Sequence, residues 1–182
     1  RLMPGMSLRL EPLPGLERGT RLHVRGPNVM LGYLMPDAPG ILNTPPDGEY
    51  DTGDIVEVDE NGYICIIGRV RRFARIAGEM VSLSAVEELA ARTWPAHAHG
   101  GTALPNEGHG EQVVLATDNP DANRQTLQEE ARRSGISELI VPHKVVVVAA
   151  IPLLGSGKTD YTRLDEMVAE SLGATAAAAE EV

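Results

Sequence analysis

The first part of the chain alternates between hydrophobic and polar residues in short runs that Gly and Pro separate. Ser7–Leu10 and Arg21–Arg25 alternate with a period of two, which predicts half-buried strands. Two further apolar runs flank Asn61-Gly62, a pair that is the strongest short-range signal for a β-hairpin. We therefore expect residues 1–70 to form a small β-barrel-like subdomain, with a β-sandwich as the alternative.

Beyond Arg69 the apolar residues repeat with helical spacing. Ser82 is a good N-cap for an amphipathic helix that follows it. The predicted elements run in the order helix, strand, helix, strand, helix, over residues 83–93, 113–117, 121–133, 144–149 and 162–172. This order predicts a compact α+β domain over residues 71–172. The Ala-rich tail, residues 173–182, is of low complexity, and we expect it to be disordered.

Composition narrows the classes of function. The 182 residues carry a formal net charge of -10, and aromatic residues make up only 3%. Such a chain is a poor match for nucleic acid, whose recognition relies on basic and stacking side chains. No apolar run approaches the roughly 20 residues of a membrane-spanning helix. The single Cys65 lies in an apolar run, so we expect a buried, unreactive thiol and no internal disulfide.

The segment Tyr50-Asp51-Thr52-Gly53-Asp54 stands at the entry to a predicted strand. A carboxylate that follows a glycine at a strand edge, such as Asp54, can accept two hydroxyl hydrogen bonds, as the 2′,3′-diol of a ribose requires. A turn with an Asp cap is the structural alternative, because Asp and Gly are common turn residues. The segment alone does not decide between these interpretations.

An arginine cluster follows within residues 68–79. Its members are Arg69, Arg71, Arg72 and Arg75. The guanidinium group is suited to bidentate recognition of phosphate or carboxylate. On a chain with 16 basic and 26 acidic residues, the cluster predicts a docking surface for an anionic ligand or an acidic protein. A solvated run of charges is the alternative.

Residues 152–160 form a glycine-rich loop that carries Lys158. Gly157-Lys158-Thr159 matches the end of a P-loop, but that motif needs a glycine about five positions before Gly157, where this chain has Pro152. We therefore reject a phosphate cradle of the P-loop type. The remaining prediction is a lysine on a loop that can place its charge on a phosphate or a carboxylate. An exposed lysine without a specific role is the alternative.

The histidines do not predict a metal site. His97, His99 and His109 have no Cys or carboxylate at ligand spacing, so we expect no metal ligands among them. The chain also has no Gly-x-Ser-x-Gly motif, so the sequence does not predict a Ser/His/Asp triad.

In their order along the chain, these segments resemble the C-terminal motifs of the adenylate-forming superfamily, which includes acyl-CoA synthetases, peptide-synthetase adenylation domains and luciferases. Val24–Tyr33 is similar to the motif that precedes them. Residues 72–83 and 152–158 are most similar to the acyl-acyl carrier protein synthetase region of bifunctional 2-acylglycerophosphoethanolamine acyltransferases. Most relatives carry acidic residues where this chain has Arg71 and Arg72, and this departure favours the carrier-protein branch.

The resemblance implies an ATP/AMP-binding role for the first motif. Asp54 would hold the ribose hydroxyls of ATP, with Tyr50, Thr52 and Gly53 beside it. Arg69 would contact the ribose or the phosphates. Residues 1–70 would then be the β-rich end of a large adenylation domain.

Residues 71–172 would be a mobile lid. Arg71 would be its hinge, and Gly78 and Glu79 would line the channel for the phosphopantetheine arm. Lys158 would be the catalytic residue, placed between the α-phosphate and the attacking carboxylate. The residues implied to dock a carrier protein are Arg71, Arg72 and Arg75.

The reaction that the resemblance implies uses ATP and Mg²⁺ to adenylate a fatty acid. The acyl group then passes to the pantetheine thiol of acyl carrier protein, serving lysophospholipid reacylation, and a fused acyltransferase would fit this role. The phosphate-binding loop and the acyl pocket of the family would lie in an upstream adenylation domain, so we expect this chain alone to be inactive. The enzyme would act on the cytoplasmic side, with the full-length protein associated with the inner membrane.

Two alternatives stay open. A fatty acyl-CoA ligase is one, because Arg71, Arg72 and Arg75 also suit the phosphates of coenzyme A. The other is a non-catalytic module that docks a carrier protein. Docking without an upstream catalytic partner would favour the module.

Overall fold

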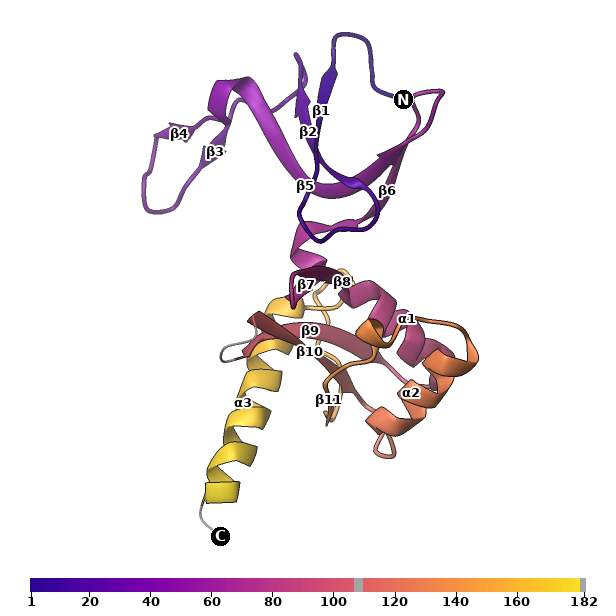
Figure 1. Cartoon of the computed structure of the whole chain (residues 1–182). Helices are drawn as coiled ribbons and strands as arrows, with labels where there is room; N and C mark the ends of the chain where they lie inside the picture. The colour runs from indigo at the N-terminus through magenta and orange to yellow at the C-terminus, as the bar shows by residue number, and fades with distance from the viewer. Residues whose placement is uncertain (107–109, 181–182) are drawn as a thin grey trace. The chain divides into compact units, whose positions relative to one another are not determined.

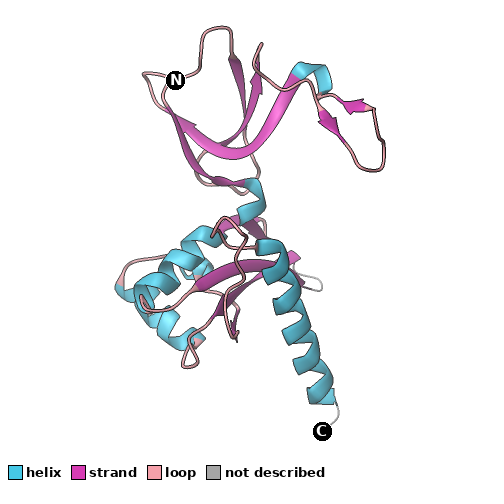
Figure 2. Cartoon of the chain, turned by 180° about the vertical axis from the view of Figure 1, so that it is seen from behind, coloured by secondary structure: helices cyan, strands magenta, loops and turns pink. Residues whose placement is uncertain are grey.

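The computed structural model describes residues 1–106 and 110–180, and the chain divides into two compact units, Arg1–Arg71 and Arg72–Val182. The first unit contains strands and short 3₁₀ segments, and the α-helices belong to the second, as Figure 2 shows. The α+β class predicted from the sequence is confirmed. Among the described residues, no helix has the length and apolar character needed to cross a membrane.

The first unit is built on an antiparallel sheet with the strand order β1-β2-β5-β6 (Figure 1). Its strands are β1 (Ser7–Glu11), β2 (Thr20–Arg25), β5 (Glu49–Val58) and β6 (Ile64–Arg69). A separate hairpin pairs β3 (Tyr33–Leu34) with β4 (Leu42–Asn43), and a short 3₁₀ helix, η1 (Pro46–Gly48), leads into β5. The predicted barrel-like subdomain is not a closed barrel: within the described residues its four-stranded sheet stays open.

The turn between β5 and β6 contains the predicted Asn61-Gly62 pair, and this prediction is confirmed. Gly62 has a φ of 77°, and its N–H donates to the carbonyl of Asp59 at 2.9 Å. Burial along β6 differs from expectation, because Cys65 is exposed and the neighbouring Ile66 is 60% exposed. The predicted buried thiol is therefore wrong: β6 is an edge strand whose faces are poorly covered by the rest of this unit.

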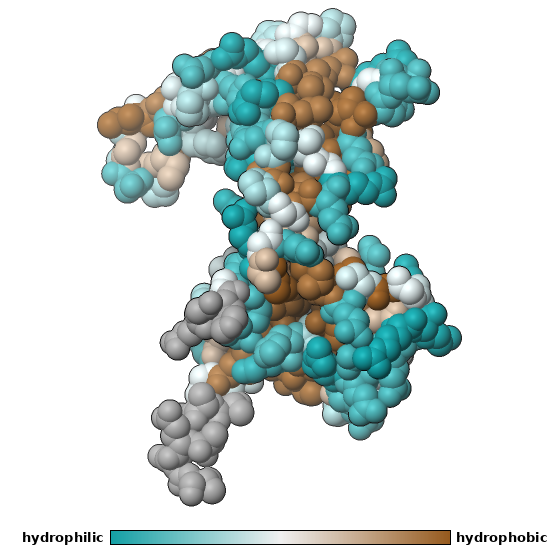
Figure 3. All heavy atoms as spheres, in the orientation of Figure 1, coloured by the Kyte–Doolittle hydropathy of each residue, from teal (hydrophilic) through white to brown (hydrophobic). Residues whose placement is uncertain are grey.

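Apolar side chains also lie at the surface around the β3–β4 hairpin. Leu31, Leu34 and Ile41 are 80%, 69% and 65% exposed. Figure 3 shows apolar residues reaching the surface of the first unit. The described part of this unit leaves these side chains uncovered, in contrast to its small core of Leu22, Ile55 and Val56.

The second unit is a five-stranded sheet with helices on both faces (Figure 1). Its strands are β7 (Phe73–Ile76), β8 (Glu79–Ser82), β9 (His99–Asn106), β10 (Gly110–Thr117) and β11 (Lys144–Val147). Its helices are α1 (Leu83–Thr93), α2 (Arg124–Arg133) and α3 (Tyr161–Glu180), with short 3₁₀ helices η2 (Val70–Arg72) at its start and η3 (Glu138–Ile140) before β11. Strand β10 is central: it pairs with β9 in antiparallel and with β11 in parallel orientation.

Alternate residues of β10 pack on opposite layers. Val113 and Leu115 join the core that α1 and α2 cover, whereas Val114 and Ala116 join the core under α3. All four side chains are at most 1% exposed. Because successive side chains of a strand point to opposite faces, a continuous apolar run indicates a strand buried on both sides.

Helix α1 has the predicted limits, and the Ser82 side chain accepts a hydrogen bond from Ala85 N at 3.3 Å as its N-cap. Helix α2 begins later than predicted, at Arg124, because residues 119–121 form a turn and Asn123 is the N-cap. Helix α3 runs past the predicted end at residue 172 to Glu180, into the tail predicted to be disordered. Residues 181 and 182 lie outside the described residues.

Candidate functional site

Strand β5 has a bulge at the predicted ribose-binding motif. In the pairing of β2 with β5, the three residues Thr52, Gly53 and Asp54 lie opposite Leu22 alone. Gly53 has a φ of 69°, a left-handed conformation that favours glycine. The Thr52 hydroxyl donates to the Leu22 carbonyl at 3.0 Å and accepts from Asp54 N at 3.1 Å. These bonds fix the backbone from which the Asp54 side chain projects.

Asp54 has one close counter-charge. It pairs across the sheet with Arg69 of β6, whose Nε lies 2.7 Å from Asp54 Oδ1. The N–H is not aimed at this oxygen, so Asp54 Oδ1 is buried without a hydrogen-bond donor among the described residues. The Asp54 residue is 8% exposed, whereas the Arg69 side chain is 66% exposed. Such an acceptor suits a ligand that brings hydroxyl donors, because an unmet buried acceptor is costly.

Asp51 and Tyr50 of the same motif are held by the protein itself. The carboxylate of Asp51 pairs with Arg21 and also accepts a hydrogen bond from Gly53 N at 3.0 Å. The Arg21 hydrogen bond is the main reason that the pKa of Asp51 lies below its usual range. The Tyr50 hydroxyl lies 3.0 Å from that of Tyr33, and this hydrogen bond, together with burial, raises the pKa of Tyr50. Asp51 thus supports the bulge that carries Asp54, whereas Tyr50 is linked to β3.

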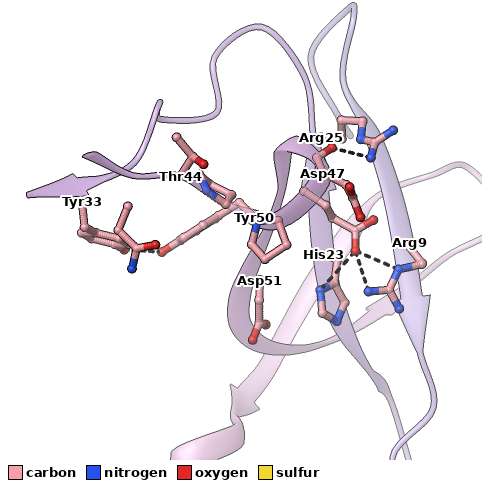
Figure 4. Close-up of a pocket in the computed structure, with 12 residues that line it drawn as sticks. Arg9, His23, Arg25, Tyr33, Thr44, Asp47, Tyr50 and Asp51 are labelled. Carbon is pink, nitrogen blue, oxygen red and sulfur yellow. Dashed lines mark hydrogen bonds and ion pairs between the residues drawn. The ribbon is translucent and has the colours of Figure 1, made fainter. Parts of the chain in front are cut away.

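A cavity of about 730 Å³ opens beside Tyr50 and Asp51 in the first unit (Figure 4). Four of its ionisable side chains, those of Arg9, His23, Glu49 and Asp51, are paired within the protein. Arg9 donates to Glu49 at 2.9 Å, and the pKa of Glu49 is lowered chiefly by this bond. His23, which is 8% exposed, also belongs to this group, with Nε2 at 2.7 Å from Glu11. The sequence alone did not indicate this cluster, because its members are far apart along the chain.

The predicted docking arginines differ in how exposed they are. Arg71 and Arg75 are exposed, and Glu111 accepts a hydrogen bond from the backbone N–H of Arg75. The side chain of Arg72 is only 16% exposed and pairs with Glu87 at 2.6 Å. Arg72 is therefore engaged inside the second unit, so its side chain is a weaker candidate for docking than those of Arg71 and Arg75.

Gly78 and Glu79 lie where β7 turns into β8. Ala77 and Gly78 have φ values of 49° and 93°, as a two-residue turn with both φ values positive requires. A side chain at position 78 would cause no steric clash, since an added Cβ would meet no atom within 4 Å. Gly78 and Glu79 are both exposed, so this turn is accessible to a ligand.

Lys158 lies on a tight, exposed turn of the second unit. Leu153 and Thr159 form a β-bridge, and Leu154 N donates to the Lys158 carbonyl at 2.8 Å. Gly157 N closes the turn with a 2.8 Å bond to the Leu154 carbonyl. The backbone under Lys158 is thus ordered while its side chain extends into solvent. We name residues 153–159 the lysine turn.

No cluster of three or more metal-ligating side chains occurs in the described part of the chain. His97 lies 3.0 Å from Asp118, and His99 makes hydrogen bonds to Thr117 and to the carbonyl of Trp94. His109 falls outside the described residues.

The comparisons with known proteins agree on one class. No family model matches the sequence. The chain is 28% identical over 153 residues to the 2,3-dihydroxybenzoate-AMP ligase of Bacillus subtilis, covering 83% of this chain and 28% of that protein. It is 31% identical over 154 residues to the L-proline--[L-prolyl-carrier protein] ligase of Streptomyces coelicolor, covering 79% of this chain and 27% of that ligase.

Among solved structures, the fold is similar to that of ATP-bound MatB from Rhodopseudomonas palustris, with a TM-score of 0.68 and 23% sequence identity. The match covers 91% of this chain and 34% of MatB. The chain thus spans only about a third of MatB, and less than a third of either curated relative.

Proposed function

We infer that this chain, whose sequence and fold match the C-terminal region of the adenylate-forming ligase superfamily, supplies the ribose contact and the catalytic lysine of an enzyme that activates a carboxylic acid with ATP. The acid that we propose is a fatty acid. Because the chain spans under a third of its curated relatives, the remaining parts of the active site belong to a longer protein.

Asp54 carries this proposal. Its buried Oδ1 lacks a hydrogen-bond donor among the described residues, and the exposed side chain of Arg69 lies beside it, with Nε 2.7 Å away. A ribose diol brings two hydroxyl donors, which a carboxylate can accept together. Arg69 then adds a positive charge beside the ribose and the phosphates.

In the first half-reaction, a carboxylate oxygen of the acid attacks the α-phosphorus of ATP. A new P–O bond forms, the bond to the bridging oxygen breaks, and pyrophosphate leaves. Lys158 places its ammonium group between the two anions, where negative charge develops in the transition state. Mg²⁺ would accompany the phosphates, and the described residues offer it no cluster of ligands.

In the second half-reaction, a thiol attacks the acyl carbonyl and AMP leaves. We propose that this thiol belongs to the pantetheine arm of acyl carrier protein and that the product serves lysophospholipid reacylation at the cytoplasmic face of a membrane. The exposed Arg71 and Arg75 support an acidic partner of this kind. The exposed turn at Gly78 and Glu79 is our candidate for the path of the pantetheine arm.

Coenzyme A is the second candidate acceptor, since its phosphates also suit exposed arginines. The two acceptors are separated by measuring thioester formation from the same acyl-adenylate with each of them. A charge-removing variant, Arg75→Met, is expected to raise KM for acyl carrier protein at least about fivefold, because charged rim contacts govern encounter. If KM rises for coenzyme A only, coenzyme A is the acceptor.

The proposed ribose contact of Asp54 is tested by Asp54→Asn in the protein that contains this chain and the upstream adenylation region. The amide keeps the size of the side chain but donates where the carboxylate accepts. We expect ATP affinity to fall about tenfold or more, because hydrogen bonds to a charged group are lost. Unchanged ATP affinity would remove the ribose-binding role. The isolated chain is expected to show no ATP–pyrophosphate exchange.

A further inference from the structure

Arg72, the first residue of the second unit, is held from three sides. Its Nη2 donates to Glu87 Oε1 of α1 at 2.6 Å, and its Nη1 donates to the carbonyl of Gly101 in β9 at 2.9 Å. Its guanidinium also lies 3.7 Å above the centre of the Tyr161 ring at the start of α3. A planar cation can make all three contacts at once, whereas the ammonium of a lysine cannot.

Glu87 completes the cluster. Oε1 also accepts a hydrogen bond from Gly101 N at 2.8 Å, and Oε2 accepts one from the Tyr161 hydroxyl at 3.3 Å. The side chain of Glu87 is 19% exposed. Burial raises the pKa of Tyr161, and the negative charge of Glu87 raises it further. The ion pair therefore lies in a partly desolvated place, where breaking it costs more than at an open surface.

Tyr161 connects this cluster to the lysine turn. Asp160, which precedes Tyr161, donates its N–H to the Pro152 carbonyl at 2.9 Å and closes the loop that carries Lys158. The Asp160 carbonyl accepts the N–H of Leu164 at 2.9 Å, the first helical bond of α3. Asp160 thus links the lysine turn to the start of α3, and Tyr161 follows it immediately.

We propose that Arg72, Glu87 and Tyr161 are positioning residues that join the first residue of the second unit to the lysine turn as one rigid part. Two consequences follow. A rotation at the unit boundary is taken up at Arg71 or before it, because Arg72 is anchored. Lys158 moves together with Arg72 in that rotation, because both belong to the same rigid part. The catalytic meaning of this coupling rests on the proposed role of Lys158, but the coupling itself does not.

Hydrogen exchange on the 182-residue chain tests the coupling directly. The reporters are the amides of Leu154, Gly157 and Asp160, which are hydrogen-bonded in and around the lysine turn. Arg72→Met and Tyr161→Leu are expected to speed their exchange about tenfold, because each removes part of the cluster that holds the start of α3. Tyr161→Phe keeps the ring under the guanidinium and is expected to have a smaller effect.

The matched control is Arg132→Met, which removes another Arg–Glu pair of the same unit, 3.0 Å long and exposed on both sides. It is expected to leave exchange in the lysine turn unchanged. Amides of the central strand β10 report global unfolding, so a variant that merely destabilises the unit speeds them equally. If exchange in the turn is unchanged in Arg72→Met, or rises only in step with β10, the coupling is wrong.

The protein that includes the upstream region separates the coupling from the proposed function. Arg72→Met is expected to lower kcat for ATP–pyrophosphate exchange about tenfold with little change in KM for ATP, because Asp54 and Arg69 lie in the other unit. Arg72→Lys is expected to restore only part of kcat. Faster exchange in the turn with unimpaired kcat would preserve the coupling and overturn the role of Lys158; slower adenylation without faster exchange would overturn the coupling.

Discussion

Asp54 and Arg69 face each other across two neighbouring strands, with Arg69 Nε 2.7 Å from Asp54 Oδ1. The pair is unequal, since the carboxylate is buried and the guanidinium is largely exposed. The N–H direction leaves the buried oxygen without a hydrogen-bond donor in the described part of the chain. The carboxylate of Asp54 is thus enclosed by the protein, whereas the guanidinium of Arg69 is accessible to a ligand.

Removing the guanidinium from this pair tests how much Asp54 depends on it. Arg69→Met leaves a buried carboxylate with no counter-charge beside it, so the free energy of unfolding of the chain is expected to fall by about 1–2 kcal/mol. Asp54→Asn in the Arg69→Met background is expected to recover most of this loss. Urea unfolding of the two single variants and the double variant measures both effects, and additive losses would contradict a direct pairing.

The bulge at Gly53 makes a second prediction. A Cβ at this position meets no atom within 4 Å, so Gly53→Ala introduces only the backbone strain of a φ of 69°. We expect the free energy of unfolding to fall by about 1–2 kcal/mol, and by less for Gly53→Asn, because Asn adopts left-handed conformations more readily. Equal losses for the two variants, measured by urea unfolding, would show that strain is not the cause.

The pH dependence of stability follows from Asp51. Its pKa is lowered in the folded chain, chiefly by Arg21. A lowered folded pKa means that this pair stabilises the fold above the unfolded value of about 4, and that the stabilisation is lost as the pH falls through the folded pKa. Asp51→Asn is expected to lose less stability between about pH 5 and pH 3 than the parent chain. Unfolding curves of identical pH dependence would contradict this assignment.

Local signals account for the parts of the fold that the sequence predicted well. Ser82 can satisfy an exposed N–H of a helix start, and α1 begins directly after it. Asn61-Gly62 sets the turn between β5 and β6, because the geometry of a turn also depends on residues that are close in sequence. The apolar run 113–117 lies within β10 because a strand buried on both faces needs no polar alternation.

Strand β9 was missed because its glycines serve tertiary contacts. A Cβ on Gly100 would lie 2.4 Å from a methyl of Leu164, and one on Gly101 would lie 3.0 Å from the Leu83 carbonyl. Glycines in a strand often mark such close approach, which a single sequence does not reveal. The β7–β8 hairpin was missed because the charges of the arginine cluster obscured its alternation.

In the candidate site, too, contacts between residues far apart in sequence could not be predicted. The ribose motif and the lysine loop were recognisable from short motifs, and their functional roles remain predictions. Arg72 looked like its neighbours Arg71 and Arg75, since nothing local to residue 72 indicates contacts with Glu87, Gly101 and Tyr161. Contacts between residues far apart in sequence are decided by packing.

The central claim is that Lys158 acts in adenylation and not in thioester formation. Lys158→Ala is measured in the protein that contains the upstream region, and Lys144→Ala, which removes the other lysine of the chain, is the matched control. Because both side chains are exposed, both variants should keep the melting temperature of the parent.

Lys158→Ala is expected to slow ATP–pyrophosphate exchange about 10²- to 10³-fold, the cost of losing one electrostatic donor to the transition state. Transfer from supplied acyl-adenylate to the thiol is expected to change little. The most direct measurement is therefore the rate of ATP–pyrophosphate exchange divided by the rate of transfer to the thiol. This ratio is compared between Lys158→Ala and Lys144→Ala. A ratio that falls about 10²-fold or more supports the claim, and an equal loss in both half-reactions contradicts it.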